Sequence, residues 1–579
     1  MNDVPSVPIG DFENTLSFPS EETSLGQGGF PHISPREMYH AHPSLLTVFS
    51  ITQSARSITQ SDSCHHGFAD AYNANFDREM SVWYKVCRER KMKRLPSLGY
   101  IFCLLVILVF PNCETEGSLT RKRIDAVEDG LLRTVVFKGE NPERMKLSDR
   151  MAFYRVPGVS IAVINKSAIE WAQGYGVERI GTDLSVTPDM LFQAASISQS
   201  VAAWGILHLV ELGKIDLDVD VNAHLKSWKI PASSVTRETK TTPRHLLSHS
   251  AGLISLKLAG YPFGKTMPTV LDVLQGQKPS DSPGVYVYNE PGTEVQYSEL
   301  GYAVLHQLLE DIEGKPFHQV LTETVFQPLQ MNQSTFEIPL PDIMRTKAVA
   351  GHTRQGDPVK EGWFYYPVAA ASGLWSTSSD LCLFVIDVMK TALGQSQTVV
   401  SPESARMMLA PQLGNQGLGV EIFDTGENLY FSQRGSTEGY ECCMVAYPSR
   451  GQGVVIMANS GNGAYLIDEI LRSISDAYKW PHFIPEIKTY YRLDPSVYAQ
   501  YVGTYEVRPD YILNVTHEDY YLVIQPTGQA PTKFFVESQS TFFSIDPYIQ
   551  IQFLKDTAGS VTGLLLTQRG QTSEARKIE

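Results

Sequence analysis

The chain has 579 residues, of which 42% are hydrophobic and 19% charged, and its formal net charge is −15. This length can bury a large core and is typical of two or more domains. An acidic chain without a basic stripe in its folded part argues against a nucleic-acid partner, and we interpret the acidity as favouring solubility.

Residues 1–117 differ in composition from the rest. Residues 1–91 are rich in Ser, Pro, Gly, Asn and His without a sustained apolar period, which indicates disorder or a wrongly assigned start. A basic cluster then precedes an apolar run from Leu98 to Phe110. That run is too short to cross a bilayer of about 30 Å comfortably as a helix, but it resembles the apolar region of a signal peptide. We therefore interpret residues 92–117 as a signal peptide, with Met92 as a candidate start.

Three other interpretations of this segment stay open. A signal-anchor would tether the body to the membrane through the same apolar run. A buried core helix is the second, and the basic flank argues against it. Lipidation at Cys113 is the third, although "FPNC" lacks the small residues of a cleavage site. The favoured interpretation and the anchor both predict a body that is secreted, periplasmic or membrane-anchored, outside the cytoplasm.

Cysteine and histidine spacing gives no zinc motif. No Cys-x-x-Cys pair or His/Cys cluster has the spacing of a zinc site. Cys442 and Cys443 are adjacent, so a strand would point them to opposite faces and a disulfide between them is not expected. A metal site at Cys64, His65 and His66 is an alternative that falls in polar, irregular sequence. We expect neither a bound metal nor a cofactor.

Residues 118–480 combine β-rich runs at both ends with helical patterns between them. The expected strands are 159–164, 169–174, 442–447 and 453–458, and the expected helices are 197–212, 302–312, 380–393 and 464–478. This order predicts an α+β fold: one antiparallel sheet built from both ends of the domain, with helices on both faces and a helical insertion.

Residues 490–579 form a separate pattern after a connection with several prolines. Segments such as "YVGTYEVRPDYILNVTHEDYYLVIQP" alternate aromatic and β-branched residues with turn signals. The pattern predicts a small C-terminal all-β module.

The stretch "ASISQS", residues 195–200, places Ser196 at the start of a predicted helix whose apolar face is too continuous for the surface. A serine on the first turn of a central helix has the helix dipole and backbone N–H groups nearby, which suits a nucleophile. An N-cap serine is the commoner use of such a residue. The residues alone leave both interpretations open.

Several segments in order then resemble one family. "PDMLFQAASISQSVAAWGILHLVELGKIDLDVDV", "TPRHLLSHSAGL", "YSELGYAVLHQLLEDIEGKPF", "VAAASGLWSTSSDLCLFV" and "FSQRGSTEGYECCMVAYPSRGQGVVIMANSGNG" are similar to the serine β-lactamase-related family of class C β-lactamases, DD-peptidases and esterases. The resemblance runs from about residue 120 to 480. It implies a β-lactamase/transpeptidase-like fold and an active-site serine.

The resemblance also implies which residues form the site. The family's catalytic serine and tyrosine fall on Ser196 and Tyr297, but the lysine of its Ser-x-x-Lys motif falls on Gln199. The cation of its third motif falls on Gln433, and a position that is Asn in some members is Glu299. The substrate-binding residues implied in this way are Gln199, Glu299, Gln433, Gly435, Thr437 and Gly439.

The two glutamines change the expected chemistry. A serine hydroxyl is a weak nucleophile until a base takes its proton, and glutamine has no titratable group. Without the two cations, we expect Tyr297 to keep an ordinary pKa of about 10. The pocket should still keep its shape, with an oxyanion hole formed by the N–H of Ser196 and an N–H near residues 437–439.

Other residues are candidates to restore the lost function. Arg434, next to Gln433, is a candidate source of positive charge, and His245 or His249 a candidate base, although the resemblance places both histidines in a structural turn. Glu438 is an acidic candidate that we interpret as a solvated loop residue. Two functions follow: an exported or membrane-tethered serine hydrolase acting on an ester, amide or β-lactam, or a catalytically impaired relative that binds a small-molecule or peptide-like ligand in the same cleft.

Overall fold

The computed structural model describes residues 116–568 and 571–578, which belong to one compact unit, Glu114–Glu579. The predicted disorder at residues 1–91, the apolar run and Cys113 lie outside the described residues. Within the described ranges, no helix combines the length and the apolarity that crossing a bilayer requires.

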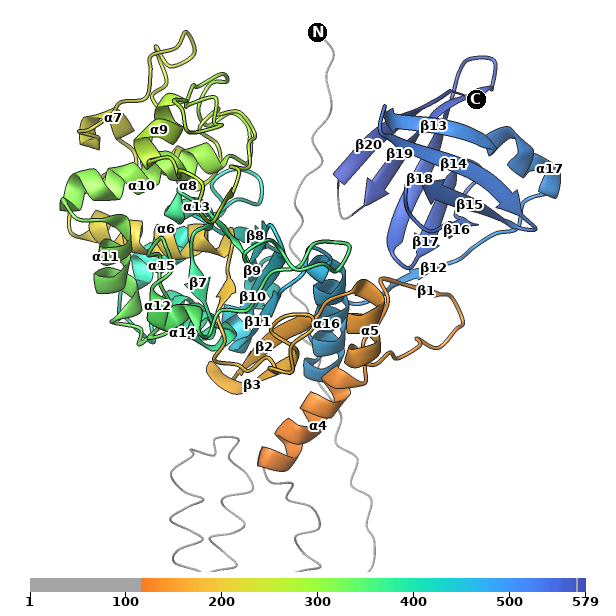
Figure 1. Cartoon of the computed structure of the whole chain (residues 1–579), viewed down its shortest axis with the longest axis horizontal. Helices are drawn as coiled ribbons and strands as arrows, with labels where there is room; N and C mark the ends of the chain where they lie inside the picture. Colours follow the sequence, from red (N-terminus) through yellow and green to blue (C-terminus); the bar gives the residue numbers. More distant parts are fainter. Residues whose placement is uncertain (1–115, 569–570, 579) are drawn as a thin grey trace, which may run out of the picture. The chain divides into compact units, whose positions relative to one another are not determined.

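A six-stranded antiparallel sheet is the centre of the larger domain (Figure 1). Its order is β3-β2-β11-β10-β9-β8, so strands from the two ends of the domain meet where β2 pairs with β11. The strands are β2 (Gly158–Asn165), β3 (Ala168–Gly176), β8 (Glu421–Phe423), β9 (Tyr430–Thr437), β10 (Tyr440–Tyr447) and β11 (Gln452–Ala458). The predicted sheet built from both ends of the domain is confirmed.

The central strands are apolar on both faces because helices cover both faces. Along β10, Cys442 and Met444 belong to the hydrophobic core on one side of the sheet, while Cys443 and Val445 belong to the core on the other. The alternation is the two-residue period of a strand. It also separates the two adjacent cysteine thiols, as the sequence predicts.

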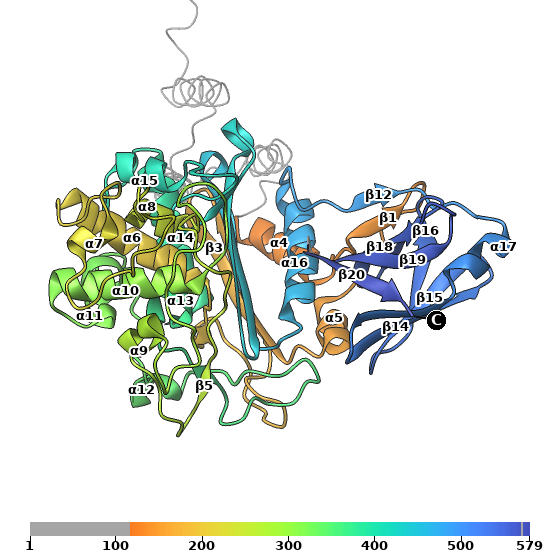
Figure 2. The same ribbon diagram turned by 90° about the horizontal axis from the view of Figure 1, so that it is seen from above.

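Helices form a layer on each side of this sheet (Figure 2). One side carries α6 (Ile197–Glu211), α10 (Glu299–Glu313) and α14 (Ser378–Ala392), and the other carries α4 (Glu116–Glu128), α5 (Leu147–Tyr154) and α16 (Gly463–Tyr478). The insertion between β3 and β8 supplies α6, α10 and α14 together with shorter helices. These are α7 (Val221–His224), α8 (Pro243–Leu247), α9 (Val270–Gln275), α11 (Phe317–Leu321), α12 (Asp342–Arg345), α13 (Ala369–Ser372) and α15 (Pro402–Met408).

Two short ladders fix the irregular parts of the insertion. Strand β4 (Phe192–Gln193), just before Ser196, pairs with β7 (Trp375–Ser376), and β5 (Tyr261–Pro262) pairs with β6 (Phe364–Tyr365). The first of these ladders holds the chain that leads into the candidate nucleophile.

The C-terminal module is a closed antiparallel barrel with its own hydrophobic core. Its strands are β13 (Gly503–Arg508), β14 (Tyr511–Glu518), β15 (Tyr521–Pro526), β16 (Thr532–Val536), β17 (Thr541–Ile545), β18 (Tyr548–Lys555), β19 (Val561–Gln568) and β20 (Gln571–Lys577). The barrel closes where β13 pairs with β20, which removes free sheet edges. Before it, β12 (Glu486–Lys488) runs parallel to β1 (Val135–Phe137), and α17 (Pro495–Tyr498) follows.

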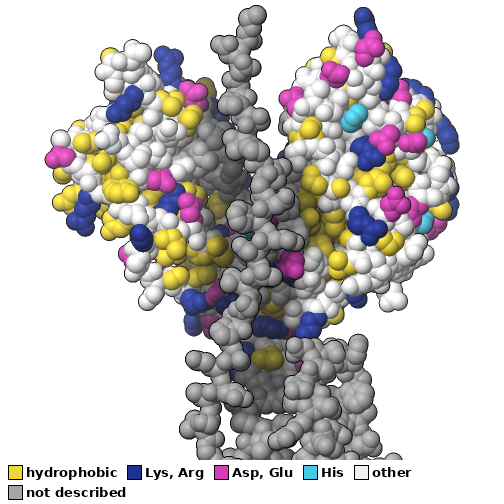
Figure 3. All heavy atoms as spheres, turned by 180° about the vertical axis from the view of Figure 1, so that it is seen from behind, with side chains coloured by type: hydrophobic (Ala, Val, Ile, Leu, Met, Phe, Trp, Pro, Cys, Tyr) yellow, Lys and Arg dark blue, Asp and Glu magenta, His cyan; other side chains and the backbone are white. Residues whose placement is uncertain are grey.

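Charged side chains of both signs are interspersed on the face of the described residues shown in Figure 3. Apolar side chains lie among them on the same face. This face carries no continuous basic stripe.

Candidate active site

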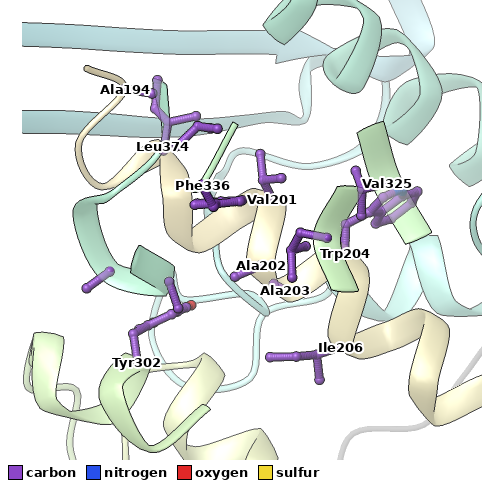
Figure 4. Close-up of a cluster of buried hydrophobic side chains, with 14 of the residues drawn as sticks. Ala194, Val201, Ala202, Ala203, Trp204, Ile206, Tyr302, Val325, Phe336 and Leu374 are labelled. Atoms are coloured by element: carbon purple, nitrogen blue, oxygen red, sulfur yellow. The ribbon is translucent and has the colours of Figure 1, made fainter. Parts of the chain in front are cut away.

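Ser196 lies at the start of a helix that is fixed by apolar packing on all sides. Figure 4 shows Val201, Trp204 and Ile206 projecting from α6 in different directions, and each belongs to the buried core. Ser196 is the N-cap residue but its side chain makes no cap hydrogen bond. Its hydroxyl instead lies 2.8 Å from the hydroxyl of Tyr297, so the side chain is directed into the candidate site and not onto the helix backbone.

The backbone before Ser196 makes a strained turn. Ala195 has φ of 48°, in the left-handed region that side chains other than Gly seldom adopt. Such a residue costs about 1–3 kcal/mol and persists where the surroundings hold it in place. Here the N–H of Ala194 donates to the carbonyl of Leu374 at 2.8 Å, and the carbonyl of Ala194 accepts the thiol of Cys442 at 2.9 Å. The turn presents the Ser196 hydroxyl at a fixed position.

Strand β9 packs directly against this turn. A Cβ at Gly435 would lie 2.5 Å from the carbonyl oxygen of Ala194 and 2.9 Å from the Cβ of Ala195, so a side chain there would push the two segments apart. Two residues earlier, the amide of Gln433 donates to the carbonyl of Ser196 at 3.2 Å. The third-motif strand and the candidate nucleophile are therefore adjacent.

Gln199 lies one turn along α6 and is fully buried. Its Nε2 donates to the Tyr297 hydroxyl at 2.7 Å, with a longer contact of 3.5 Å to the carbonyl of Ala371. Its Oε1 lies 3.1 Å from Nε2 of His249. The amide thus has a partner at each end, which fixes its orientation.

His249 belongs to the site but cannot serve as a base there. Its Nδ1 accepts the N–H of Ser298 at 3.3 Å, so Nε2 carries the proton and donates to Gln199. Burial lowers the pKa of His249 to about 4, so the ring is neutral near pH 7. The candidate base is a donor that orients Gln199. His245, the other candidate, accepts the N–H of Thr242 within a helix cap, and no bond joins it to the site residues.

Tyr297 sits immediately before α10 and connects the other side chains. Burial, together with the nearby carboxylate of Glu299, raises its pKa well above the usual value of 10. The expectation of an ordinary pKa is therefore wrong, because the sequence reveals neither the burial nor this neighbour. The phenol is neutral and keeps its proton throughout the physiological pH range.

Glu299, the first residue of α10, is only 2% exposed. Its Oε2 accepts the N–H of Leu258 at 2.6 Å, and its Oε1 accepts the hydroxyl of Ser372 at 3.1 Å and that of Tyr297 at 3.5 Å. Burial raises its pKa above the ordinary carboxyl value of 4.5. The sequence suggested a substrate contact at this position, and the structure adds the contact with Tyr297.

Arg434 does not supply charge to the site. Its guanidinium pairs with Asp468 of α16 at 2.6 Å, on the other face of the sheet from Gln433. Successive residues of a strand point to opposite faces, which explains the difference. The idea that Arg434 replaces the missing cation is wrong.

The remaining residues of the motif line the end of β9. The hydroxyl of Thr437 donates to the side-chain oxygen of Gln193 at 3.0 Å, and the carbonyl of Gly439 accepts the N–H of His352 at 3.3 Å. Glu438 is exposed, and its N–H donates to the Tyr366 hydroxyl at 2.9 Å. Among the described residues, no acceptor is bonded to the N–H of Ser196. This donor is available to a ligand, and its pairing with a second N–H of β9 stays a prediction.

Among the described residues, no group of three or more His, Cys, Asp or Glu side chains is arranged to hold a metal ion. The site is thus a chain of hydrogen-bonded side chains. It runs from Ser196 to Tyr297 and divides there. One branch reaches Glu299, and the other reaches His249 through Gln199.

Comparison with known proteins gives consistent matches over the larger domain. A family profile described as Beta-lactamase matches residues 144–474, more than half of the chain. "Penicillin-binding protein 4*" of Bacillus subtilis (strain 168) is 23% identical over 440 residues, which cover 70% of this chain and 92% of that protein. "Penicillin-binding protein 4" of Amycolatopsis lactamdurans is 24% identical over 344 residues, which cover 55% of this chain and 85% of that protein.

A solved structure shares the fold. The octameric penicillin-binding protein homologue from Pyrococcus abyssi aligns with a TM-score of 0.51 at 20% identity, covering 74% of this chain and 98% of that chain. At this identity the match shows a common fold and nothing finer.

Proposed function

The chain belongs to the beta-lactamase family, and on that premise we propose that it is a serine hydrolase whose Ser196 forms a transient acyl-enzyme. The observation that carries the proposal is the 2.8 Å contact between the hydroxyls of Ser196 and Tyr297, made in place of a helix cap. A hydroxyl held against a proton-relaying partner at the start of a central helix is the arrangement that nucleophilic catalysis requires.

The reaction would proceed in two halves. Ser196 Oγ would attack the acyl carbon of an ester, amide or β-lactam, and the leaving group would depart with a proton, giving an acyl-serine. Water would then release the acid and regenerate the serine. The free N–H of Ser196 at the start of α6 would stabilise the developing oxyanion.

The substrate is a small or peptide-like acyl compound, and the charges favour a neutral one. Gln199 and Gln433 carry no charge, Arg434 is paired on the other face, and Glu299 is acidic. An anionic substrate group would therefore find fewer opposite charges here than the family pattern provides. We expect neutral esters to react faster than carboxylated β-lactams.

A second function, ligand binding without turnover, is favoured by one specific observation. Two neutral glutamines occupy the positions that the resemblance assigns to cations, and Tyr297 is too weakly acidic to act as an ionised base. Under this alternative the cleft binds an acyl ligand through the same donors, and Ser196 remains unmodified.

A fluorophosphonate probe separates the two functions, because it labels a serine only when the hydroxyl is activated. We expect covalent labelling of the purified chain, abolished by Ser196→Ala and competed by p-nitrophenyl esters. A mass shift that persists in Ser196→Ala would place the reactive nucleophile elsewhere and overturn this proposal. No labelling after prolonged exposure, alongside measurable ligand binding, would establish the binding function instead.

The place of action is a further part of this proposal. The basic cluster followed by the apolar run of residues 98–110 supports export, with the body outside the cytoplasm or tethered to a membrane by that run. Mass spectrometry of the N-terminus of the protein isolated from its source tests cleavage. Recovery of the body inside the cytoplasmic membrane, protected from added protease even after the outer cell envelope has been opened, would contradict export.

A further inference from the structure

The site must provide a group that takes the proton of Ser196. Gln199 has no titratable atom. His249 is bonded at both ring nitrogens, one as an acceptor from Ser298 and the other as a donor to Gln199. Neither residue offers a free lone pair to the serine, so the base lies elsewhere.

A carboxylate lies one contact beyond Tyr297. Glu299 Oε1 is 3.5 Å from the Tyr297 hydroxyl, which is 2.8 Å from Ser196 Oγ. Hydrogen bonds from the Leu258 N–H and the Ser372 hydroxyl hold the carboxylate in place. The contact of 3.5 Å is long, but catalytic hydrogen bonds in unliganded sites are often long and tighten when substrate binds.

The three neighbours of the Tyr297 oxygen fill its three hydrogen-bonding positions. A phenol has one proton to donate and two lone pairs to accept with. Gln199 Nε2 can only donate to it, and the Glu299 carboxylate can only accept from it. The remaining lone pair faces Ser196, so the serine hydroxyl donates to Tyr297. Two of these bonds therefore form a donor chain from Ser196 through Tyr297 to Glu299, and the third donates into the same oxygen from Gln199.

We propose that Glu299 is the proton acceptor for Ser196, reached through Tyr297. As Ser196 Oγ bonds to the acyl carbon, its proton passes to the Tyr297 oxygen while the proton of Tyr297 passes to Glu299 Oε1. The negative charge moves from the carboxylate to the tetrahedral oxyanion, and Tyr297 stays neutral. When the bond between the acyl carbon and the leaving group breaks, Tyr297 gives its proton to the leaving group and takes back the proton held by Glu299, which becomes a carboxylate again. The inference rests on the proposed hydrolase function.

The electrostatics of the site agree with this relay. The raised pKa of Tyr297 disfavours its anion, which the relay never forms, and burial gives Glu299 a stronger basicity than an ordinary carboxylate. The neutral amide of Gln199 donates to Tyr297 without forming an ion pair with Glu299. A cation at position 199 would hold the carboxylate ionised and weaken it as a base.

The relay predicts that the rate declines on the acidic side of the pH–rate profile. This decline, the acidic limb, is caused by protonation of Glu299. The titratable or charged groups acting on it are Tyr297, the exposed Lys257, and Tyr366, whose pKa Glu299 in turn raises. His249 contacts Tyr297 from the other side and is neutral above about pH 4. The rate should fall as pH falls through the raised pKa of Glu299.

The central test is Glu299→Gln, which keeps the size of the side chain and removes its basicity. We expect fluorophosphonate labelling and p-nitrophenyl ester hydrolysis to slow by about 10²–10⁴, the usual range for a lost general base, and the acidic limb to disappear. The matched control is Glu427→Gln, which removes an exposed acid just before β9, away from Tyr297 and the site residues. Ser372→Ala, which deletes one donor to the carboxylate, should keep the limb and move it to higher pH.

The outcomes distinguish the relay from the proposed function. If Glu299→Gln is labelled as fast as the wild type and keeps the acidic limb, the relay is wrong, but the proposed hydrolase function is still supported. No labelling of Ser196 in the wild type overturns both. If Glu299→Gln does not fold, a proton inventory of wild-type ester hydrolysis in H₂O–D₂O mixtures decides. A curved inventory, with two protons in flight, supports the relay, and a linear one contradicts it.

Discussion

Tyr297 joins the two halves of the site through a single hydroxyl. It accepts from Gln199 at 2.7 Å, lies 2.8 Å from Ser196 and donates to Glu299 at 3.5 Å. Both the direct activation of Ser196 and the transfer to a distal carboxylate pass through this oxygen. Without this oxygen, the Ser196 hydroxyl has no hydrogen-bonded connection to Gln199 or Glu299.

Tyr297→Phe removes that oxygen and keeps the ring. We expect the rate of fluorophosphonate labelling at Ser196 to fall by about 10²–10⁴, since Ser196 then lacks an acceptor for its proton. Thermal unfolding should change little, because Gln199 keeps its contact with the carbonyl of Ala371 and its acceptor role toward His249. Undiminished labelling of the Phe variant would show that Ser196 is activated by another group.

The neutral, buried imidazole of His249 links stability to pH. Burial lowers its pKa from 6.5 to about 4, so between these pH values the unfolded chain binds a proton that the folded chain does not. Stability is retained above pH 6.5 and lost as pH falls toward 4. The loss from this one group amounts to about 3 kcal/mol.

His249→Gln tests this linkage through chemical unfolding at several pH values. The variant should lose less unfolding free energy than the wild type between pH 6.5 and 4, because glutamine binds no proton. Its stability at pH 7 is not the readout, since the substitution also alters the contacts to Gln199 and Ser298. Parallel stability curves for the two proteins over this pH range would contradict the assignment.

Strand β9 illustrates which elements the sequence predicts and which it does not. Strands β2, β10 and β11 are apolar on both faces, so their runs are visible in the sequence. "YFSQRGST" of β9 has no such run, and only the family resemblance drew attention to it. The strand forms because it pairs with β10 on one side and β8 on the other. Helix α10 likewise begins at Glu299, before the predicted start at residue 302. The apolar pattern does not reveal this start, because the first residue of the helix is polar although it is buried.

The close approach of β9 to the turn before Ser196 depends on Gly435. In Gly435→Ala the new Cβ would meet the carbonyl of Ala194 at 2.5 Å, so the strand must shift. Overpacking of this kind costs about 1–3 kcal/mol. We expect a lower free energy of unfolding together with slower labelling of Ser196, because Gln433 on the same strand bonds to its carbonyl.

Ser436→Ala is the matched control on the same strand. Its hydroxyl is partly buried and bonds to Glu441, away from the turn. It should cost only about 0.5–1.5 kcal/mol, the usual contribution of one hydrogen bond, and leave labelling intact. An equal loss of labelling in both variants would mean that β9 acts through general stability and not through its contact with the turn.

The fold as a whole was more predictable from the sequence than the network inside it. The sheet built from both ends and the all-β module follow from apolar runs and turn signals, which are local. The Ser196–Tyr297 contact joins residues separated by 101 positions, so only the resemblance could bring them together. The link from Tyr297 to Glu299 and the raised pKa values depend on burial, which no local pattern encodes. The expected ordinary pKa of Tyr297 is wrong for this reason, since burial and Glu299 raise it.

The barrel is tied to the larger domain by a buried charge cluster. Arg150 of α5 pairs with Glu469 of α16 at 2.7 Å and with Asp546, between β17 and β18, at 2.8 Å. The side chains of Arg150 and Glu469 are only 7% and 3% exposed. The hydroxyl of Tyr154 donates to Glu469 at 2.8 Å and so belongs to the same cluster. One guanidinium thus holds together two helices and a barrel turn.

Removing Arg150 alone should destabilise the protein far more than removing the cluster. Arg150→Met leaves Glu469 buried without its cation, which costs about 3–5 kcal/mol. The combined variant Arg150→Met, Tyr154→Phe, Glu469→Leu and Asp546→Leu replaces the whole cluster, including the Tyr154 hydroxyl that bonds to both carboxylates, by apolar groups and should be close to neutral. Calorimetry measures the unfolding temperature and the unfolding transitions of the single and the combined variant. In the single variant we expect the unfolding transition to split, because the barrel has its own hydrophobic core and loses its charged tie to the larger domain. A single transition at the wild-type temperature in Arg150→Met would show that the two cores are coupled by their apolar contacts and that the charge cluster contributes nothing measurable.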